Sequence, residues 1–415
     1  MKRILIISEL FYPKNAIGAL RPTKIRKYLT ERGYTVDVIT KSFAEKDNIE
    51  NGQIWRIDAA ADTLECVSAA PRSSDRGLVK ELKRAKRTLI SIKRSKLYCR
   101  DVLRFIDTHS VQVVEYDAVF TTFGPVSSIF IGLELKKKYP KIKWLCDFRD
   151  PMVVEEVSVF FKPYMRAIQN KACQLADKII AVSSGYLKRI CNGRYVDKSY
   201  MIPNGYDSED LSLIRQTYSN GLLRFAYVGS LYEGKRKVSP LFQILRNLID
   251  DGEISAEKIC FDYAGNDYYF LAEQAKEYNL EGVLVNHGKL SRDACLQLQA
   301  EASFLVLCTW NNKGEEGVFP GKFLEYMLFN KPIIALVDGN IANSEVATVM
   351  REGNLGAVYE EKNSESDFEE MKKYFSDTFS EFYTTGQIKF VPSEDVLNRY
   401  DYGNIATKIE DLIYG

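Results

Sequence analysis

Short apolar segments alternate with longer amphipathic segments along almost the whole chain. The short segments hold about five apolar residues each and are bounded by Gly, Pro, Asn or Asp, which is typical of buried strands. The longer segments repeat their apolar positions every three or four residues, as helices do. This alternation predicts an α/β fold with parallel sheets that carry helices on both faces.

The predicted strands form two sets. The first set is Arg3–Ile7, Thr35–Thr40, Val111–Tyr116, Ala118–Thr121, Lys143–Asp147 and Lys178–Val182. The second set is Leu223–Val228, Lys258–Ala264, Gly282–His287, Phe304–Leu307, Pro332–Leu336 and Gly356–Tyr359. The polar stretch Tyr206–Asn220 lies between them and is typical of an interdomain linker. We therefore expect one Rossmann-like domain over residues 1–206, a second over 207–390, and a helix within 391–415 that returns to the first.

Length and charge support two domains and exclude one class of partner. The chain has 415 residues, more than one hydrophobic core usually supports. It carries 57 basic and 56 acidic residues, whereas a dedicated nucleic-acid binder needs a basic surplus for its phosphate contacts. We therefore expect no nucleic-acid partner.

Cysteine, histidine and hydropathy patterns indicate a cytoplasmic protein without a metal site. The eight cysteines show no C-x-x-C spacing, so we expect reduced, buried thiols. The chain has two histidines, which makes a histidine-based metal site unexpected. The opening "MKRILIIS" is too short for a secretory signal and is typical of a buried first strand, and no apolar run approaches the roughly 20 residues of a membrane span.

The segment "GVFPGKFLEYMLFNKPIIA", from Gly317 to Ala335, has the pattern of an anion site. Pro320 suits a helix start, so the N–H groups of Gly321, Lys322 and Phe323 would point outward together. Such a helix N-terminus binds phosphate. Glu325 lies one turn further, where its carboxylate could accept hydrogen bonds from neighbouring hydroxyls. The segment therefore predicts a site for a nucleotide diphosphate.

Polar motifs also follow several predicted strands. They are "GALRP", "FGPVSS", "DFRDP", "SS" after Val182, and "GSLYEGKRK". Ligands of open parallel sheets lie beyond the carboxyl ends of the strands. We therefore expect the site in a cleft between the two sheets.

An ordered series of motifs resembles the group 1 (family 4) nucleotide-sugar glycosyltransferases. The series is "NAIGALRP", "ADKIIAVSSGYLKRI", "IPNGYD", "FAYVGSLYEGKR", "FDYAGN" and "PGKFLEYMLFNKPIIA". The resemblance implies the GT-B fold, in which two Rossmann-like domains face each other across a cleft, with the acceptor on the first domain and the nucleotide sugar on the second. "DFRDP" and "GSLYEGKR" are similar to the branch that builds bacterial surface polysaccharides.

The resemblance assigns the donor-binding residues to the second domain. Glu325 would bind the ribose hydroxyls, and Gly321, Lys322 and the Phe323 amide would hold the distal phosphate. The alternative for Glu325 is a solvated glutamate that complements the helix dipole.

Catalysis would depend on the loop after "YVGS". There Lys235 and Arg236 would stabilise the charge of the leaving diphosphate, with Gly229 and Ser230 letting the backbone approach it. Which two of Lys235, Arg236 and Lys237 reach inward stays open, as does a solvated basic turn.

The resemblance assigns three roles in the first domain. Gly18 would let donor and acceptor approach, and Asp150 would be the catalytic polar group at the sugar. Arg21 and Arg149 would bind the acceptor, Arg21 through an anionic group. A helix start for Gly18 and Arg21, and a strand-end turn for Asp150, are the structural alternatives.

One position departs from the pattern of the family. Many relatives carry a second glutamate before the ribose glutamate, with seven residues between the two, but here that position is Gly317, with Glu315 and Glu316 out of register. Sugar selection through that side chain is therefore not expected. By resemblance the reaction retains anomeric configuration, needs no metal and uses no cofactor.

The segment 79–100 is strongly basic and amphipathic. It sets Leu82, Leu89, Ile90, Ile92 and Leu97 among many Lys and Arg residues. This pattern is typical of a helix that rests on an anionic membrane, and equally of a core helix with a charged outer face.

We therefore expect a cytoplasmic glycosyltransferase, peripheral on the inner face of the cell membrane, that transfers a hexosyl or related glycosyl group from a nucleotide-diphosphate sugar to a growing, lipid-linked glycan. The alternatives are a non-hydrolysing nucleotide-sugar epimerase and a catalytically silent nucleotide-sugar-binding subunit.

Overall fold

The computed structural model describes residues 2–14, 16–42, 54–58, 77–109, 111–209, 221–232, 234 and 236–415. The chain forms two compact units: unit 1 is Met1–Asn204 with Tyr402–Gly415, and unit 2 is Gly205–Asp401. The sequence predicts boundaries at 206/207 and 390/391. In the structure the chain returns to unit 1 at Tyr402, so helix α12 (Glu394–Asn398) lies in unit 2.

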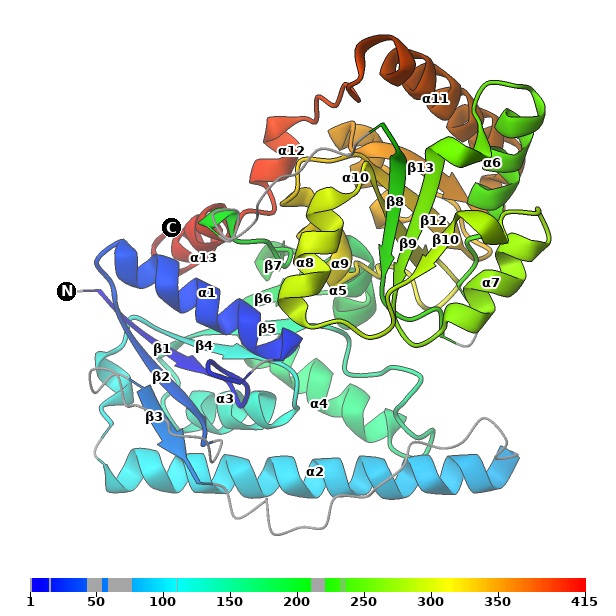
Figure 1. The fold of residues 1–415 in the computed structure, drawn as a ribbon. Helices are drawn as coiled ribbons and strands as arrows, with labels where there is room; N and C mark the ends of the chain where they lie inside the picture. Colours follow the sequence, from blue (N-terminus) through cyan, green and yellow to red (C-terminus); the bar gives the residue numbers. More distant parts are fainter. Residues whose placement is uncertain are drawn as a thin grey trace. The chain divides into compact units, whose positions relative to one another are not determined.

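Unit 1 is built on one parallel sheet (Figure 1). Its seven strands have the order β3-β2-β1-β4-β5-β6-β7. Their bounds are β1 Arg3–Ile7, β2 Thr35–Lys41, β3 Ile54–Ile57, β4 Ala118–Thr122, β5 Lys143–Arg149, β6 Lys178–Ala181 and β7 Ser199–Met201. The strand order reverses between β1 and β4, which makes the loops after these two strands the expected ligand site of the sheet.

Helices cover both faces of this sheet. They are α1 (Ile17–Glu31), α2 (Gly77–Thr108), α3 (Ser127–Lys138), α4 (Lys162–Leu175), α5 (Ser184–Cys191) and α13 (Tyr402–Tyr414), with short 3₁₀ turns η2 (Val113–Glu115) and η3 (Val196–Lys198). One core joins the sheet to α2, α3 and α4. The other joins it to α1 and α13, so the C-terminal helix completes the first unit.

Unit 2 repeats this architecture with six strands in the order β10-β9-β8-β11-β12-β13. The bounds are β8 Leu223–Val228, β9 Ile259–Ala264, β10 Leu284–Asn286, β11 Phe304–Trp310, β12 Ile333–Asp338 and β13 Gly356–Glu360. All neighbouring pairs are parallel, and the order reverses between β8 and β11. The ligand site of this sheet is therefore expected at the loops after β8 and β11.

Two layers of helices enclose the second sheet. Beyond α12, its helices are α6 Ser239–Asp250, α7 Tyr268–Lys276, α8 Arg292–Glu301, α9 Gly321–Met327, α10 Glu345–Gly353 and α11 Ser364–Thr385, with 3₁₀ turns η5 (Ala256–Lys258), η6 (Glu281–Val283) and η7 (Glu361–Asn363). Residues of α6, α7 and α11 form one core with the sheet. Residues of α9, α10 and α12 form the other.

The predicted fold class is confirmed, since both units are parallel-sheet α/β domains. One predicted strand is wrong. Residues 111–116 contain the 3₁₀ turn η2, because Val111, Val113 and Tyr116 are buried while the backbone bonds locally, from the Glu115 amide to the Gln112 carbonyl and from the Tyr116 amide to the Val113 carbonyl. The closely spaced buried apolar residues therefore gave this segment a strand-like pattern in the sequence.

The residues that the structure describes contain seven free cysteines, of which six are buried; Cys66 lies outside them. Within the same ranges no group of three or more His, Cys, Asp or Glu residues could hold a metal ion. No helix among them combines the length and the apolar character needed to cross a bilayer.

Candidate functional site

The loop after β8 is the first part of the site in unit 2. Gly229 has φ 151°, a conformation that favours glycine, and its amide donates to the Ala264 carbonyl. The Ser230 hydroxyl donates to Asp267 at 2.5 Å, and the same carboxylate accepts from the amides of Leu231 and Tyr232. Asp267 therefore fixes this loop. Its carboxylate already accepts the hydrogen bond that the Ser230 hydroxyl donates. The sequence did not single out Asp267, although it lies directly after "FDYAGN".

The basic residues of this loop have different partners. Lys237 forms an ion pair with Glu361 at 2.5 Å, and this hydrogen bond raises the pKa of the Lys237 ammonium. Arg236 instead lies over the rings of Tyr232 and Trp310, at 4.5 and 5.5 Å from their centroids, and donates to the Ser230 carbonyl. Within the described ranges, no carboxylate forms an ion pair with Arg236. Lys235 lies outside the described residues.

The α9 segment differs from the prediction in one detail. Pro320 is the extended residue at the start of the helix, as expected. However, the Phe323 amide donates to the Pro320 carbonyl at 3.0 Å, and its side chain is buried in the core. The expectation that three outward N–H groups are unpaired is therefore wrong for Phe323, because the first turn closes tightly. Among the described residues, the amides of Gly321 and Lys322 have no acceptor.

Glu325 lies one turn further along α9 and is held by two cations. Its side chain is 15% exposed, and it accepts from the Lys322 ammonium at 2.7 Å and from the Arg292 guanidinium at 3.4 Å. Arg292 is the first residue of α8, whose N-cap is Ser291. The sequence analysis missed Arg292, because the two residues are 33 positions apart and no motif marks the contact.

Gly317 and Asp338 also lie at this edge of the sheet. Gly317 has φ 89°, where an L-residue is strained, so its backbone explains why glutamate does not occupy this position. Asp338 ends β12 and accepts from the Lys237 amide at 3.1 Å. Burial raises the pKa of the Asp338 carboxyl to about 6, so a group near Arg236 titrates close to neutral pH.

Unit 1 brings three of the predicted residues together. Arg149 ends β5 in the left-handed conformation with φ 53°, next to a register shift in the pairing of β5 with β6. Its guanidinium donates to the Gly18 carbonyl at 3.1 Å and lies 3.6 Å from the Asp150 carboxylate. A Cβ on Gly18 would lie 2.8 Å from the Leu10 side chain and 3.4 Å from Arg149. Gly18 therefore leaves space for the side chains of Leu10 and Arg149, which a Cβ at this position would crowd.

Asp150 remains accessible. Its side chain is 46% exposed, and the surrounding protein raises the pKa of its carboxyl by desolvation, which Arg149 partly opposes. It lines a pocket of about 530 Å³ together with α2 and the loop after β4. This is the place where a polar group could contact a sugar.

Arg21 does not have the geometry expected of an acceptor-binding residue. Its side chain is 1% exposed and forms a two-point ion pair with Asp147, at 2.9 and 3.1 Å. It also donates to the carbonyls of Ile202 and Pro203. Because its donors are used inside the protein, the prediction that Arg21 contacts an acceptor is wrong. Asp147 also accepts a hydrogen bond from the Thr122 hydroxyl at 2.8 Å.

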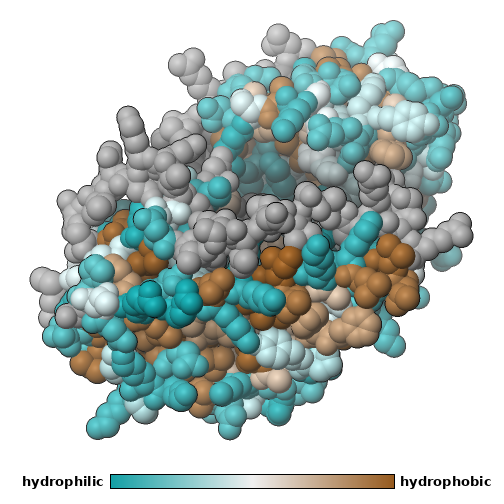
Figure 2. All heavy atoms as spheres, turned by 90° about the horizontal axis from the view of Figure 1, so that it is seen from below, coloured by the Kyte–Doolittle hydropathy of each residue, from teal (hydrophilic) through white to brown (hydrophobic). Residues whose placement is uncertain are grey.

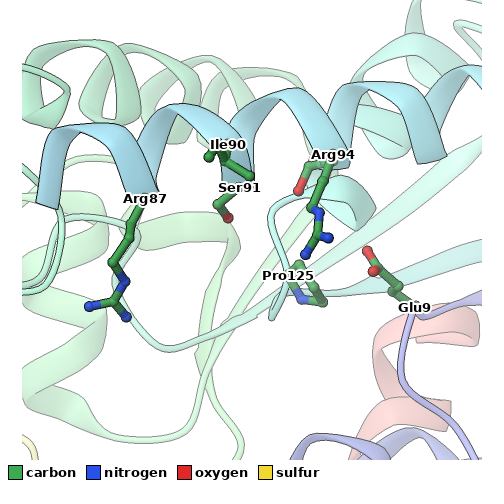
Figure 3. Close-up of a pocket in the computed structure, with 7 residues that line it drawn as sticks. Glu9, Arg87, Ile90, Ser91, Arg94 and Pro125 are labelled. Carbon is green, nitrogen blue, oxygen red and sulfur yellow. The ribbon is translucent and has the colours of Figure 1, made fainter. Parts of the chain in front are cut away.

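A second pocket, of about 260 Å³, lies where the strand order of unit 1 reverses. Arg94 points from α2 toward Pro125 and Glu9, which follow β4 and β1, while Arg87 and Ser91 extend from the same side of α2 (Figure 3). Arg87, Ser91 and Pro125 line both pockets, so the two adjoin. The sequence analysis did not identify these residues as a site.

Comparisons with known proteins concern the family and the fold. Residues 23–210 match the model of Glycosyltransferase Family 4. No curated protein matches the chain in sequence.

Solved structures similar to the whole chain include three GT-B proteins. Sucrose-phosphate synthase of Thermosynechococcus elongatus is 14% identical with a TM-score of 0.62, over 100% of this chain and 98% of that one. The lipopolysaccharide outer core galactosyltransferase WaaB is 14% identical with a TM-score of 0.60, over 100% and 99%. HepE of Anabaena, solved with UDP-glucose, is 15% identical with a TM-score of 0.55, over the full length of both chains.

At these identities the solved structures establish the fold alone, and the family model, which covers residues 23–210, supports a glycosyltransferase. The resemblance seen in the sequence motifs is thereby confirmed. The chain is a glycosyltransferase of the GT-B type whose residues 23–210 match Glycosyltransferase Family 4.

Proposed function

We propose that this enzyme transfers a glycosyl group from a nucleotide-diphosphate sugar, bound by unit 2, to a hydroxyl of a growing glycan, bound by unit 1. The observation that carries the proposal is the arrangement around α9. A nearly buried carboxylate, Glu325, lies within hydrogen-bond distance of two cations and one turn along the same helix from two unpaired amides. Nucleotide sugars present both hydroxyls and phosphates, and this arrangement offers partners for both.

The roles at α9 follow from the donors and acceptors present. A carboxylate has about four lone-pair sites, and Lys322 and Arg292 use two of those of Glu325, which leaves capacity for two ribose hydroxyls. The amides of Gly321 and Lys322 suit the distal phosphate. The Lys322 ammonium would exchange its bond to Glu325 for a phosphate oxygen, since both are charge-assisted hydrogen bonds.

Arg236 is the described cation best suited to the leaving diphosphate. It has no carboxylate partner within the described ranges, whereas Lys237 is neutralised by Glu361. A fixed guanidinium near the departing phosphates stabilises negative charge that grows in the transition state. This contribution allows a reaction without a metal or other cofactor. We propose Arg236 with Lys235 for this role, in a transfer that retains anomeric configuration and has Asp150 at the sugar.

The acceptor is proposed to be a lipid-linked saccharide of a cell-surface polysaccharide, with the enzyme in the cytoplasm at the inner face of the membrane. Supporting this, Leu78, Val79 and Leu82 on α2 are more than half exposed among basic residues, and so are Val159 and Phe160. Figure 2 shows hydrophobic and hydrophilic side chains mixed on the face that includes α2. By contrast, Ile92 faces the core, so only part of the predicted apolar stripe is available to lipid.

A nucleotide panel tests the donor assignment. Uridine, guanosine and cytidine diphosphates and their sugars are screened by thermal shift, because a ligand that binds the native state raises its melting temperature. We expect one base to give a shift that Glu325→Gln abolishes. Glu370→Gln, on the exposed face of α11, is the matched control and keeps it. A full shift with Glu325→Gln contradicts the ribose assignment.

Product analysis separates the proposed activity from its alternatives. Transfer to an added acceptor supports the glycosyltransferase. Conversion of the donor to an isomer without an acceptor indicates an epimerase, and binding without turnover indicates a silent subunit. The family match over residues 23–210 favours the first outcome.

A further inference from the structure

The two adjoining pockets of unit 1 form one groove, which we call the α2 groove. It is bounded by α2, by the loops after β1 and β4, and by the segment 150–157. The groove lies at the reversal of strand order in the first sheet, where open parallel sheets bind ligands. Its pockets, of about 530 and 260 Å³, together have the size of small-molecule sites.

The far wall of the groove is held to α2 by specific polar contacts. Glu81 accepts from the Ser158 hydroxyl at 2.6 Å and from the Val159 amide at 2.7 Å. The Ser158 amide donates to the Thr88 hydroxyl, and Arg84 pairs with Glu155 at 3.1 Å. These contacts join the helix to the segment after β5. The groove is therefore a formed feature of the fold.

The charges in the groove favour an anion near α2. Arg87 lines both pockets, and within the described ranges it has neither an ion-pair nor a hydrogen-bond partner. Arg94 lies two turns along on the same face (Figure 3). Glu156 also lines the larger pocket, but α2 as a whole carries ten basic and three acidic residues, which makes the potential along the helix positive.

The remaining acidic groups near Arg87 have protein partners. Glu9 accepts from the Ser127 hydroxyl at 2.5 Å, and Asp150 lies 3.6 Å from the Arg149 guanidinium. The apolar lining, which includes Phe123, Met152 and Met165, offers a surface for the C–H face of a sugar ring. A single groove thus combines an available cation, an apolar wall and, in Asp150, an accessible carboxylate.

We propose that the α2 groove is the acceptor subsite and that it selects an acceptor bearing a phosphate, which Arg87 binds while the receiving hydroxyl lies at Asp150. This inference rests on the proposed function and adds the chemical class of the acceptor. A phosphorylated saccharide and a lipid phosphate headgroup share this chemistry. The experiment must therefore distinguish them.

The test measures ligand binding by saturation-transfer NMR with three probes: glucose, glucose 6-phosphate, and dihexanoyl phosphatidic acid below its micellar concentration. We expect a phosphate-bearing probe to bind and glucose to bind much more weakly. Binding of glucose 6-phosphate alone assigns a phosphorylated sugar, and binding of the lipid alone assigns a lipid headgroup. Equal binding of glucose and glucose 6-phosphate, without lipid binding, overturns the proposal, as does binding of no probe.

Matched variants locate the site. Arg87→Gln should weaken binding about tenfold or more, the loss expected for one charge-assisted hydrogen bond. Lys93→Gln removes the same charge from an exposed position of α2 outside both pockets and should change nothing. Ser91→Phe, which fills the groove without changing charge, should abolish binding. Equal effects of Arg87→Gln and Lys93→Gln overturn the proposal.

Nucleotide binding distinguishes this proposal from the proposed function. Arg87→Gln should keep the full thermal shift with the nucleotide diphosphate, because the donor residues lie in unit 2. If no nucleotide shifts the wild-type protein, the donor assignment fails, while the phosphate probes still decide whether the α2 groove binds anions.

Discussion

The buried ion pair between Arg21 and Asp147 allows a decisive test of a structural role against an acceptor-binding role. Arg21→Met removes the guanidinium but keeps a long apolar side chain. The Asp147 carboxylate, fully buried, then keeps only the Thr122 hydroxyl as a side-chain partner within the described ranges, and the carbonyls of Ile202 and Pro203 each lose a donor.

The expected loss of stability follows from this geometry. Breaking a buried pair by removing one partner costs about 3–5 kcal/mol, because an uncompensated charge remains inside the protein. For a unit of this size, each kcal/mol lowers the melting temperature by roughly 2–4 °C, which gives a decrease on the order of 10 °C. An exposed arginine gives no such loss, and Arg166→Met on α4 is the matched control.

Differential scanning calorimetry measures the decrease, and hydrogen exchange of peptides from β4 and β5 assigns it to unit 1. A double-mutant cycle with Asp147→Asn isolates the pair: the double variant should lose much less than the sum of the two single losses. The structural role is refuted if Arg21→Met melts like Arg166→Met and instead raises the KM for the acceptor.

Three further predictions concern single side chains. Gly321→Ala should fold normally, since no described atom lies within 4 Å of the new methyl group, yet it should weaken donor binding by about tenfold in calorimetric titration; unchanged binding argues against a phosphate at this amide. Asp338→Asn should stabilise the protein by up to about 3 kcal/mol at pH 7.5 and by little at pH 4. The folded state holds this proton up to a pH of about 6, so the stability it contributes below the unfolded pKa is lost as pH rises; a difference independent of pH in denaturant unfolding contradicts this. Gly132→Ala should cost about 1–3 kcal/mol despite a better helix propensity, because its Cβ would lie 2.3 Å from the Trp144 ring; a variant as stable as wild type contradicts the packing.

The sheets were predictable from sequence because their strands are buried on both faces and form continuous apolar runs. Two strands were missed, Ile54–Ile57 and Ser199–Met201, because each is short and carries polar residues. The observed β5 and β11 extend beyond the predicted ends at Asp147 and Leu307, to Arg149 and Trp310. The local sequence pattern thus predicted the type of each element better than its first and last residues.

Side-chain partners could not be predicted, because they depend on residues far apart in the chain. Arg21 stands in a motif at the expected sheet edge, but its partners lie 126 to 182 positions away. Only the folded chain shows that Asp147 neutralises it. The same reasoning applies to Arg292, which a helix start places beside Glu325 without any sign in its own neighbourhood.

The ion pairs of the basic residues also indicate which of these residues are available to bind a phosphate. Several cations near the predicted sites are matched by carboxylates: Lys237 by Glu361, Lys322 by Glu325 and Arg149 by Asp150. A neutralised cation binds phosphate only if it gives up its partner, which offsets part of the gain. Within the described ranges, Arg236 in unit 2 and Arg87 in unit 1 have no carboxylate partner to give up when they bind a phosphate. The sugar donor and the acceptor are therefore expected to be anchored first at these two arginines, and exchange at the paired cations follows.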